Sequence, residues 1–449
     1  MLPKGTRDIL PGPMRVRTHI MQIVESVFQC YAFVRIETPA IELNKSLSGK
    51  YGEEGDRLMF KVLPRGEKLK KFEGKTASEM QAGVEEALRY DLTVPFARFV
   101  VDHRNDLAFP FKRYQIQNVW RGDRPQKGRY REFTQCDADV VGISGIVQEA
   151  EMMHIYNDVF HSLDLPAQLA LNHRKLLLAI AEKVGAADRF IPFTVALDKL
   201  DKIGWAGVRS EWEAMGIVVD DQWASLFTSE LHLDEDGLAQ LAQWLGPVAD
   251  QALEELTSLS ELLSARPLDH LSLKLDLTLA RGLDYYTGCI FEIRSTGAKI
   301  GSLGGGGRYD DLTSVFGLKD TPGIGISFGL DRIQLAMEEL GLTEAVKGSQ
   351  THLLIAHMGA STQADHFSMA QQLREEGWVA ELYPTAARLK KQMAFASRSG
   401  IRFFILRGEQ ERDADKVLIK DLQEGVQTEA TGSEWIDRLR EMLPPAGTQ

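Results

Sequence analysis

The sequence predicts an α+β protein built from three blocks. Residues 1–186 and 266–340 mix strand-like and helix-like segments. Residues 187–265 contain only helix-like segments, and residues 351–449 alternate strand and helix as a small α/β domain does. We therefore expect one large domain interrupted by a helical insertion, a linker over residues 341–350, and a separate C-terminal domain.

The composition is that of an ordinary soluble globular protein: 449 residues, 44% hydrophobic and 26% charged. The three cysteines, Cys30, Cys136 and Cys289, have neither disulfide nor zinc spacing, which favours a reducing compartment. The N-terminus has no apolar run long enough for a signal peptide, and no segment is long enough to span a bilayer. We expect a cytoplasmic protein without a membrane partner.

The first block is predicted to begin with an amphipathic helix over residues 16–28, where apolar side chains recur on one side. A strand over residues 31–36 is expected next, ending at Pro39. The polar, glycine-punctuated residues 49–82 are typical of a loop-rich hairpin region. Further elements are a helix at 95–101, a helix at 146–163, a strand at 168–172 and a helix at 174–184.

Asp91 and Thr93 stand where a strand edge meets the helix that starts at Pro95. Proline suits the first turn of a helix, so this junction is well defined. Helix capping is the common role of such residues and is weighed first, with ligand binding as the alternative.

Residues 111–142 are the most distinctive segment, predicted as two strands joined by a charged loop over residues 121–131. Residues 112–131 contain seven Lys/Arg and one Asp, a balance of +6, whereas the whole chain carries −12. A concentrated cationic hairpin on an acidic protein indicates an anionic ligand. Polyphosphate or nucleic-acid backbone suits guanidinium groups best. A solvated basic hairpin tip is the alternative.

The predicted insertion carries almost all of the net acidity. Residues 201–270 contain fourteen Asp/Glu and three Lys/Arg, a balance of −11. The overall charge therefore does not exclude an anion-binding face elsewhere. Four tryptophans in this region are predicted to be core anchors: Trp205, Trp212, Trp223 and Trp244.

Two glycine-containing stretches follow the insertion, after strands predicted over residues 271–279 and 289–293. Residues 301–310 include four consecutive glycines, which suit either a flexible link or backbone packed closely against a ligand. Residues 323–333 pass from a strand of small residues into an amphipathic helix, with Arg332 in its first turn.

The C-terminal domain is predicted to contain strands at 353–356, 379–382, 403–406 and 416–421, with helices at 364–376 and 388–399. Its net charge is only −2, so a nucleic-acid role there would need a local cationic face such as Arg388, Lys390 and Lys391.

Together these motifs resemble the histidyl-tRNA synthetase family of class II aminoacyl-tRNA synthetases, over the whole chain. The strand ending at Pro39 is similar to class II motif 1, residues 111–142 to motif 2 and residues 323–333 to motif 3. Arg-Gly-Leu-Asp-Tyr-Tyr at residues 281–286 and Gly-Gly-Gly-Gly-Arg-Tyr-Asp at residues 304–310 resemble signatures of the histidine enzyme. The opening Lys-Gly-Thr-Arg-Asp, residues 4–8, also fits.

The resemblance implies a six-stranded antiparallel catalytic sheet flanked by helices, a helical insertion and an α/β anticodon-binding domain. It implies activation of histidine by ATP to histidyl-adenylate plus pyrophosphate, then transfer of histidine to the terminal adenosine of tRNA(His). It further implies a homodimer formed through motif 1. Mg²⁺ would be held mainly by the ATP phosphates, with no metal site on the protein.

Three catalytic arginines are implied by the resemblance. Arg121 would bind the α-phosphate of ATP, Arg281 would reach it from the opposite side, and Arg332 would bind the γ-phosphate. Phe133 would stack under adenine, although a core role is the better interpretation of this residue alone. The other implied ATP-binding residues are Asp123 and Arg129.

The implied histidine site holds the α-ammonium group with Asp91, Thr93 and Gln135. Asp139 and Tyr286 would contact the imidazole nitrogens, and the remaining pocket residues would be Arg281 and Tyr285. A pocket that bonds both nitrogens can reject near-isosteres by about 10⁴–10⁵, so editing is unnecessary. Asp91 and Asp139 stand where some relatives have glutamate. The implied contacts to the tRNA acceptor end are Arg124, Gln126 and Lys127.

Two other functions remain open at this point. A paralogue of this family is a catalytically inactive, histidine-sensing regulatory subunit, but such proteins tend to lose the motif arginines and the C-terminal domain. A plain RNA-binding module would explain the cationic hairpin and leave the histidine signatures unexplained.

Overall fold

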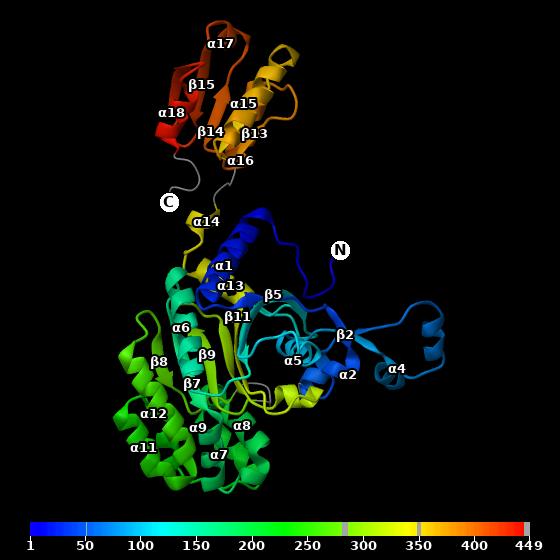
Figure 1. Cartoon of the computed structure of the whole chain (residues 1–449), viewed down its shortest axis with the longest axis vertical. Coiled ribbons are helices and arrows are strands. Elements are labelled where there is room, and N and C mark those ends of the chain that lie inside the picture. Colours follow the sequence, from blue (N-terminus) through cyan, green and yellow to red (C-terminus); the bar gives the residue numbers. More distant parts are fainter. Residues whose placement is uncertain (51, 281–285, 348–351, 444–449) are drawn as a thin grey trace. The chain divides into compact units, whose positions relative to one another are not determined.

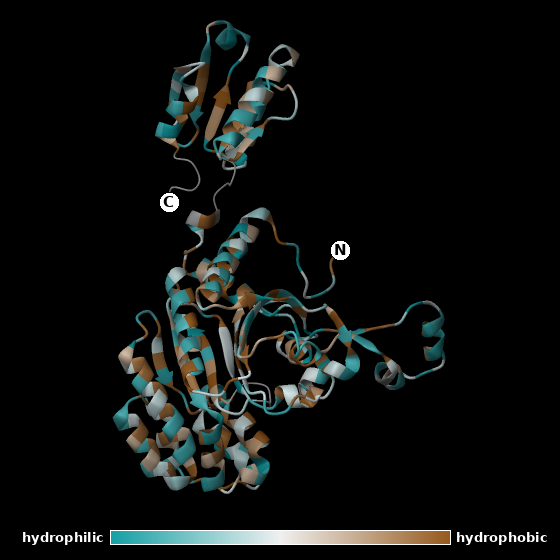
Figure 2. Cartoon of the chain, viewed as in Figure 1, coloured by the Kyte–Doolittle hydropathy of each residue, from teal (hydrophilic) through white to brown (hydrophobic). Residues whose placement is uncertain are grey.

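The structure is a computed structural model that describes residues 1–50, 52–280, 286–347 and 352–443. The chain divides into two compact units, Met1–Thr343 and Glu344–Gln449. Each unit contains its own sheet (Figure 1). Apolar residues are concentrated on the strands of these sheets, as Figure 2 shows.

The first unit is organised around an eight-stranded sheet. Its six inner strands are antiparallel, which confirms the expected class II sheet, and one short parallel strand is added at each edge. In order across the sheet the strands are β1 (Val34–Arg35), β5 (Phe111–Trp120), β6 (Glu132–Val141), β11 (Gly323–Gly329), β10 (Gly304–Tyr309), β9 (Cys289–Ser295), β7 (Ala167–His173) and β8 (Ser272–Leu275).

The four consecutive glycines form most of strand β10, so they are not a flexible link. A Cβ atom on Gly306 would lie 2.1 Å from the Gly325 carbonyl oxygen, and one on Gly304 would lie 2.6 Å from the Ser327 carbonyl oxygen. Any side chain at these two positions would collide with strand β11. The prediction was close packing against a ligand, whereas the close neighbour that the structure shows at these two glycines is strand β11.

Helices α1 (Pro11–Cys30), α6 (Val147–Ser162) and α13 (Leu330–Glu339) pack together against β6 and β11. The Phe328 ring of β11 lies 5.8 Å from the Phe28 ring of α1 and 4.8 Å from the Tyr156 ring of α6. All three aromatic rings are buried. The helices predicted at 16–28 and 146–163 are thus confirmed, although the first begins earlier.

Beside this sheet lies helix α5 (Thr93–Asp102), which packs against the 3₁₀ segment η4 (Leu312–Phe316). A three-stranded sheet, β2 (Ile41–Leu43), β4 (Glu86–Leu88) and β3 (Lys61–Val62), precedes α5 in the chain. The region expected to be a loop-rich hairpin, residues 49–82, is more helical than the sequence predicted. It contains α3 (Gly52–Leu58), η1 (Gly66–Phe72) and α4 (Ala77–Gly83), and short α2 (Asn44–Leu47) comes before it.

After α7 (Arg174–Lys183), the chain is helical up to Ala265, in α8 (Phe190–Leu197), α9 (Leu200–Ala214), α10 (Gln222–Thr228), α11 (Glu235–Leu245) and α12 (Asp250–Ala265). Trp212 is fully buried and stacks on Phe193 at 4.6 Å. Trp205 meets Trp212 edge-on, and Trp223 lies against Trp244. The predicted core role is confirmed for Trp212 and Trp223, which are buried, whereas Trp205 and Trp244 are only half-buried.

The second unit has the sheet order β13-β12-β14-β15-β16, after short α14 (Glu344–Lys347). The predicted strands and helices are present as β12 (Leu353–Ile355), α15 (Gln363–Glu375), β13 (Ala380–Leu382), α16 (Leu389–Arg398), β14 (Phe403–Leu406) and β15 (Lys416–Asp421). The sequence did not predict α17 (Glu409–Asp413), β16 (Gln427–Thr431) or α18 (Trp435–Met442). In neither unit does a described helix have the length and apolar character needed to cross a membrane.

Candidate active site

A cavity of about 230 Å³ lies where the loop between β5 and β6, the start of β10 and the start of α13 meet. Residues from the motif 2-like and motif 3-like segments and from the glycine stretch at 301–310 line it, which the sequence alone could not establish. Six of the predicted site residues line this cavity: Arg121, Asp123, Arg129, Phe133, Gln135 and Arg332.

Arg121 follows β5 and is held without a carboxylate. Its Nε donates a hydrogen bond to the Tyr90 carbonyl oxygen at 3.0 Å. Its guanidinium lies 4.3 Å from the Tyr90 ring centre and 5.3 Å from that of Phe133, both distances at which cation–π attraction operates. Since Arg121 forms no ion pair among the described residues, its charge is available to an anion in the cavity.

Arg332 lies in the first turn of α13, as predicted. Its Nε donates to the Gly128 carbonyl oxygen at 3.1 Å and its Nη1 to the Ser302 carbonyl oxygen at 2.8 Å. These contacts connect motif 3 to the tip of the motif 2 loop and to Ser302, two residues before β10.

The neighbouring residue, Asp331, anchors the N-terminus of the chain to the same turn. Its buried carboxylate forms ion pairs with Arg7 and with Arg17 of α1. The Arg7 guanidinium also lies 3.8 Å from the Tyr130 ring centre in the motif 2 loop. The Gly5 carbonyl oxygen accepts a hydrogen bond from the Arg131 backbone at 2.8 Å. The opening residues therefore contact Asp331 and Tyr130, which line the cavity, without lining it themselves.

The motif 2 loop carries most of the predicted phosphate and tRNA contacts. Asp123 is paired with Arg129 at 3.4 Å, and Lys127 is paired with Glu339 of α13 at 2.8 Å. Arg124, Gln126, Lys127 and Arg129 are all exposed. The loop thus presents cations both to the cavity and to solvent.

A second, smaller cavity of about 30 Å³ adjoins the first, because Gly305 and Ser327 line both. Four predicted or neighbouring polar residues line it: Thr93, Asp139, Tyr286 and Asp137. A narrow, buried and polar space beside a larger cationic one suits a small polar substrate.

Asp139 is engaged by two fixed partners in this second cavity. Its carboxylate accepts a hydrogen bond from the Tyr309 hydroxyl at 2.5 Å and forms an ion pair of 2.7 Å with Arg113. Arg113 and Asp139 are both buried. Burial raises the pKa of Asp139, while Arg113 and Tyr309 oppose that rise.

Asp137 is a site residue that the sequence analysis missed. It lies on β6 between Gln135 and Asp139, and side chains two residues apart on a strand share one face. Burial raises the pKa of Asp137 to about 7, and the nearby Asp139 carboxylate adds to the rise. Its Oδ1 has no hydrogen-bond partner in the described part of the chain. The period-two alternation through Gln135 and Asp139 would have identified it.

The residues expected to bind an ammonium group are divided between the cavities: Gln135 lines the larger one, Thr93 the smaller one, and Asp91 neither. Gln135 donates from Nε2 to the Ser327 hydroxyl at 3.0 Å, while its buried Oε1 accepts no hydrogen bond from the described residues. Asp91 is buried, and its Oδ1 accepts a hydrogen bond from the Val94 backbone at 3.2 Å. The helix-capping role weighed for Asp91 is therefore confirmed. Thr93 lines the smaller cavity.

Two of the predicted site residues, Arg281 and Tyr285, lie outside the described residues. Tyr286 is described, and a Cβ atom on Gly307 would lie only 2.9 Å from its ring, so the ring packs directly on β10. Thr287 then donates to the Asp310 carboxylate at 2.6 Å and, from its backbone, to the Arg308 carbonyl oxygen at 2.8 Å.

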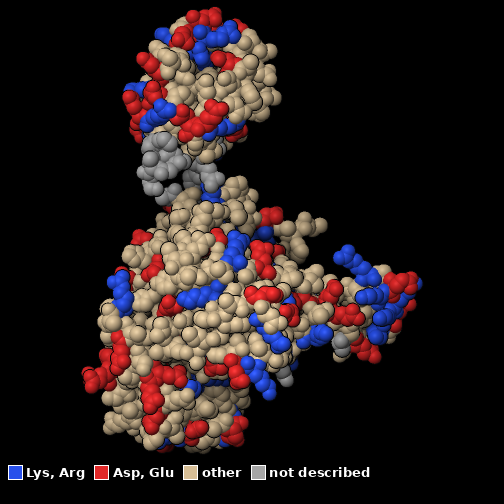
Figure 3. Space-filling model, viewed as in Figure 1, with Lys and Arg blue, Asp and Glu red and all other residues tan. Residues whose placement is uncertain are grey.

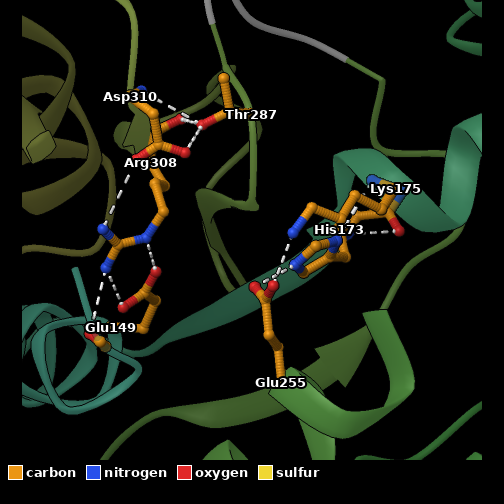
Figure 4. Close-up of polar contacts among 9 residues, drawn as sticks. Glu149, His173, Lys175, Glu255, Thr287, Arg308 and Asp310 are labelled. Atoms are coloured by element: carbon orange, nitrogen blue, oxygen red, sulfur yellow. Dashed lines mark hydrogen bonds and ion pairs between the residues drawn. The ribbon is translucent and has the colours of Figure 1, made fainter. Parts of the chain in front are cut away.

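Two groups of ion pairs, drawn in Figure 4, connect strand β10 to helix α6 and the junction of β7 and α7 to helix α12. Arg308 binds both oxygens of the buried Glu149 of α6, at 2.5 and 2.6 Å. Nearby, Glu255 of α12 bonds to His173 at 2.9 Å and to Lys175 at 2.6 Å. The pKa of Glu255 is lowered to about 2, chiefly by the hydrogen bond with His173. Glu255 thus connects helix α12 of the acidic insertion to strand β7 and helix α7.

Comparisons with known proteins show the family to which the chain is related. The family model described as histidyl-tRNA synthetase matches residues 5–333, and that of an anticodon binding domain matches residues 352–442. A histidine–tRNA ligase from Christiangramia forsetii is 46% identical over 439 residues, covering 95% of this chain and 96% of the relative.

Two solved structures also resemble the chain. A crystal structure of histidyl-tRNA synthetase from Nostoc superposes with a TM-score of 0.83 at 28% identity, covering 99% of both chains. An ATP phosphoribosyltransferase regulatory subunit/histidyl-tRNA synthetase from Bacillus halodurans shares the fold, with a TM-score of 0.72 at 23% identity and coverage of 91% and 98%. On the family match and the identity to its relatives, the chain belongs to the histidyl-tRNA synthetase family.

Proposed function

We propose that the two adjoining cavities bind ATP and histidine and catalyse the histidine–tRNA ligase reaction of this family. The observation that carries the proposal is the convergence of Arg121 and Arg332, far apart in the sequence, on one cavity beside a buried polar pocket. Adenylate formation needs in-line placement of the histidine carboxylate and neutralisation of charge on the phosphates. It needs no covalent nucleophile on the protein.

In the larger cavity, Arg121 binds the α-phosphate and Arg332 the γ-phosphate, while Phe133 stacks on adenine. Two aromatic rings beneath the guanidinium and a carbonyl oxygen hold Arg121 in place without cancelling its charge. Arg281, by family resemblance, reaches the α-phosphate from the other side. Asp123 and Arg129 complete the nucleotide contacts as a pair.

Mg²⁺ is proposed to be held mainly by the ATP phosphates, where it supplies positive charge. The carboxylates that line the larger cavity support this, because Asp123 is paired with Arg129 and Asp331 with Arg7 and Arg17. The chain's own contribution is the orientation of its arginines toward the oxygens that gain negative charge.

In the smaller cavity, Asp139 and Tyr286 contact the imidazole nitrogens of histidine, and Asp137 joins them. Because Arg113 and Tyr309 fix the Asp139 carboxylate, its orientation is set before histidine binds. Gln135 offers its unpartnered Oε1 to the α-ammonium group, with Asp91 and Thr93 beside it. Tyr285 lines the same pocket by resemblance. A buried site of this kind leaves polar groups unpaired when an isostere enters.

The remaining elements of the proposal concern tRNA(His) and assembly. The exposed Arg124, Gln126 and Lys127 contact the tRNA acceptor end, and the second unit binds the anticodon, as its family match indicates. By resemblance, two chains associate through motif 1, and the protein works in the cytoplasm.

The test is histidine-dependent ATP–pyrophosphate exchange, followed by histidine transfer to tRNA(His). Exchange that requires histidine and no other amino acid is the expected result. A histidine-sensing regulatory protein would bind histidine without exchange, and an RNA-binding module would bind tRNA without either. Either outcome would overturn the proposal.

A further inference from the structure

The connection between strands β3 and β4 is much longer than the hairpin requires. Residues 63–85 separate the two strands, whereas most hairpin turns need about two to five residues. The additional chain folds into η1 and α4 and projects from the first unit as an arm (Figure 1). We call residues 61–86 the basic arm, because of its charge.

The basic arm contrasts with the acidity of the chain. Residues 61–75 contain six Lys/Arg and two Glu, a balance of +4 on a chain of −12. From Arg65 to Lys75 every residue is exposed except Phe72. Figure 3 shows the Lys and Arg side chains gathered along one edge of this projection. Exposed like charges this close repel one another, so the cluster is stabilised by an anionic partner.

Four of these cations line one groove. A cavity of about 390 Å³ beside η1 has Arg65, Lys68, Lys71 and Lys75 in its wall, with Glu85 and Glu86 as its acidic residues. The ion pair of Lys68 with Glu85 spans 3.7 Å between exposed groups, so it neutralises little charge. The groove therefore keeps a net positive charge. Phe72 is buried, so the arm offers cations to a phosphate backbone and no exposed ring on which a base could stack.

The chain that leads into the basic arm touches the motif 2 loop at Leu58. The Gly122 backbone donates a hydrogen bond of 2.7 Å to the Leu58 carbonyl oxygen, and the Leu88 backbone donates one of 2.8 Å to the Phe60 carbonyl oxygen. The cations of the arm thus start beside the loop that carries Arg124 and Lys127.

We infer that the groove of the basic arm binds the phosphate backbone of the tRNA substrate beside its acceptor end. This inference rests on the proposed function and adds a second cationic surface to it. The arm raises affinity independently of base sequence, while discrimination among tRNAs comes from other contacts. A second copy of this chain, with its acidic insertion, is the competing occupant of the groove.

The experiment replaces three groove lysines together, Lys68→Gln, Lys71→Gln and Lys75→Gln, in the full chain. We measure binding of a tRNA(His) transcript over a range of KCl concentrations, the histidine-dependent exchange rate without tRNA, and the sedimentation coefficient. Loss of three phosphate contacts lowers the slope of log affinity against log salt by about 2–3 and raises Kd on the order of 10-fold to 100-fold at low salt. Exchange and sedimentation stay unchanged.

The matched control removes the same charge from exposed lysines elsewhere: Lys183→Gln, Lys202→Gln and Lys319→Gln. A single Lys70→Gln variant adds a closer control, because Lys70 lies on η1 outside the groove and pairs with Glu67 at 2.8 Å. The inference is overturned if the groove variant keeps the wild-type salt slope, or if it sediments as a smaller species with tRNA binding intact. Absence of histidine-dependent exchange in the wild-type protein would instead refute the proposed function.

Discussion

Gly325 of β11 is the position where one added methyl group tests the small cavity most directly. A Cβ atom there would lie 2.0 Å from Asp139 Oδ1 and 2.6 Å from Asp139 Cγ. The carboxylate cannot move away freely, because Tyr309 and Arg113 hold its two oxygens at 2.5 and 2.7 Å. Gly325→Ala therefore either strains the sheet or breaks the buried pair.

The size of the effect follows from these two alternatives. Overpacking a core costs about 1–3 kcal/mol, and separating a buried ion pair costs about 3–5 kcal/mol. We expect a loss of about 2–5 kcal/mol in the free energy of unfolding of the first unit. For a domain of this size that lowers its thermal midpoint by roughly 4–10 °C. The KM for histidine in pyrophosphate exchange rises more than the KM for ATP, since Gly325 lines only the smaller cavity.

The control is Gly12→Ala, which adds the same methyl group on α1, where the nearest atom is Arg15 Nη2 at 3.9 Å. That variant keeps the wild-type thermal midpoint and both KM values. If Gly325→Ala also kept the wild-type midpoint and histidine KM, the Asp139 carboxylate would not be fixed as described, and the assignment of the small cavity to histidine would be refuted.

Three further predictions concern the charges around the site. Arg332→Ala and, by family resemblance, Arg281→Ala each lower the exchange rate by about 10²–10³, on the scale of one lost transition-state contact, with circular dichroism unchanged. Asp137→Asn alters the pH dependence of histidine binding. The Asp137 carboxylate of the free protein has a pKa of about 7, so it becomes neutral as the pH falls through 7. The KM of the wild-type protein for histidine therefore rises in this pH range, and the KM of the variant does not show this step. Glu255→Gln lowers the thermal midpoint at neutral pH, because the folded-state pKa of Glu255, about 2, lies below the usual 4.5. The ionised Glu255 carboxylate therefore stabilises the fold above pH 4.5, and this contribution disappears as the pH falls toward 2.

Each of these predictions has a contradicting outcome. For the arginines, an exposed control such as Arg104→Ala keeps full exchange, and an Arg332→Ala variant with the same activity would remove that residue from the mechanism. The imidazole of free histidine titrates in both proteins, so an identical pH profile in Asp137→Asn would exclude the carboxylate from binding. For Glu255→Gln, a stability difference that persists unchanged at acid pH would indicate a packing effect instead of the ion pairs with His173 and Lys175.

The sequence was most informative where local patterns determine structure. The hairpin at residues 111–142 combined period-two apolar runs with a charged loop, and both strands are present as β5 and β6. Arg332 was placed correctly because the change from small residues to helical periodicity marks the start of α13. The parallel outer strands of the sheet could not be predicted, because the pairing of β1 with β5 joins segments separated by many residues.

The candidate site was only partly predictable for the same reason. Asp137 was overlooked although it lies between two predicted residues on one strand face, because its burial depends on segments that are distant in the sequence. The glycines of β10 suited two interpretations until the carbonyl oxygens of their neighbours were known. Strand β16 escaped notice because, at the edge of its sheet, it alternates exposed and half-buried residues without a buried apolar run.

The ion pairs of Asp331 with Arg7 and Arg17 have a practical consequence for producing this protein. An expression vector that trims the first ten residues deletes no residue proposed to touch ATP or histidine, yet it strips one guanidinium from a buried carboxylate adjacent to Arg332. Such a shortened protein would purify normally but have a low turnover rate. A purification tag is therefore better fused at the far end of the polypeptide.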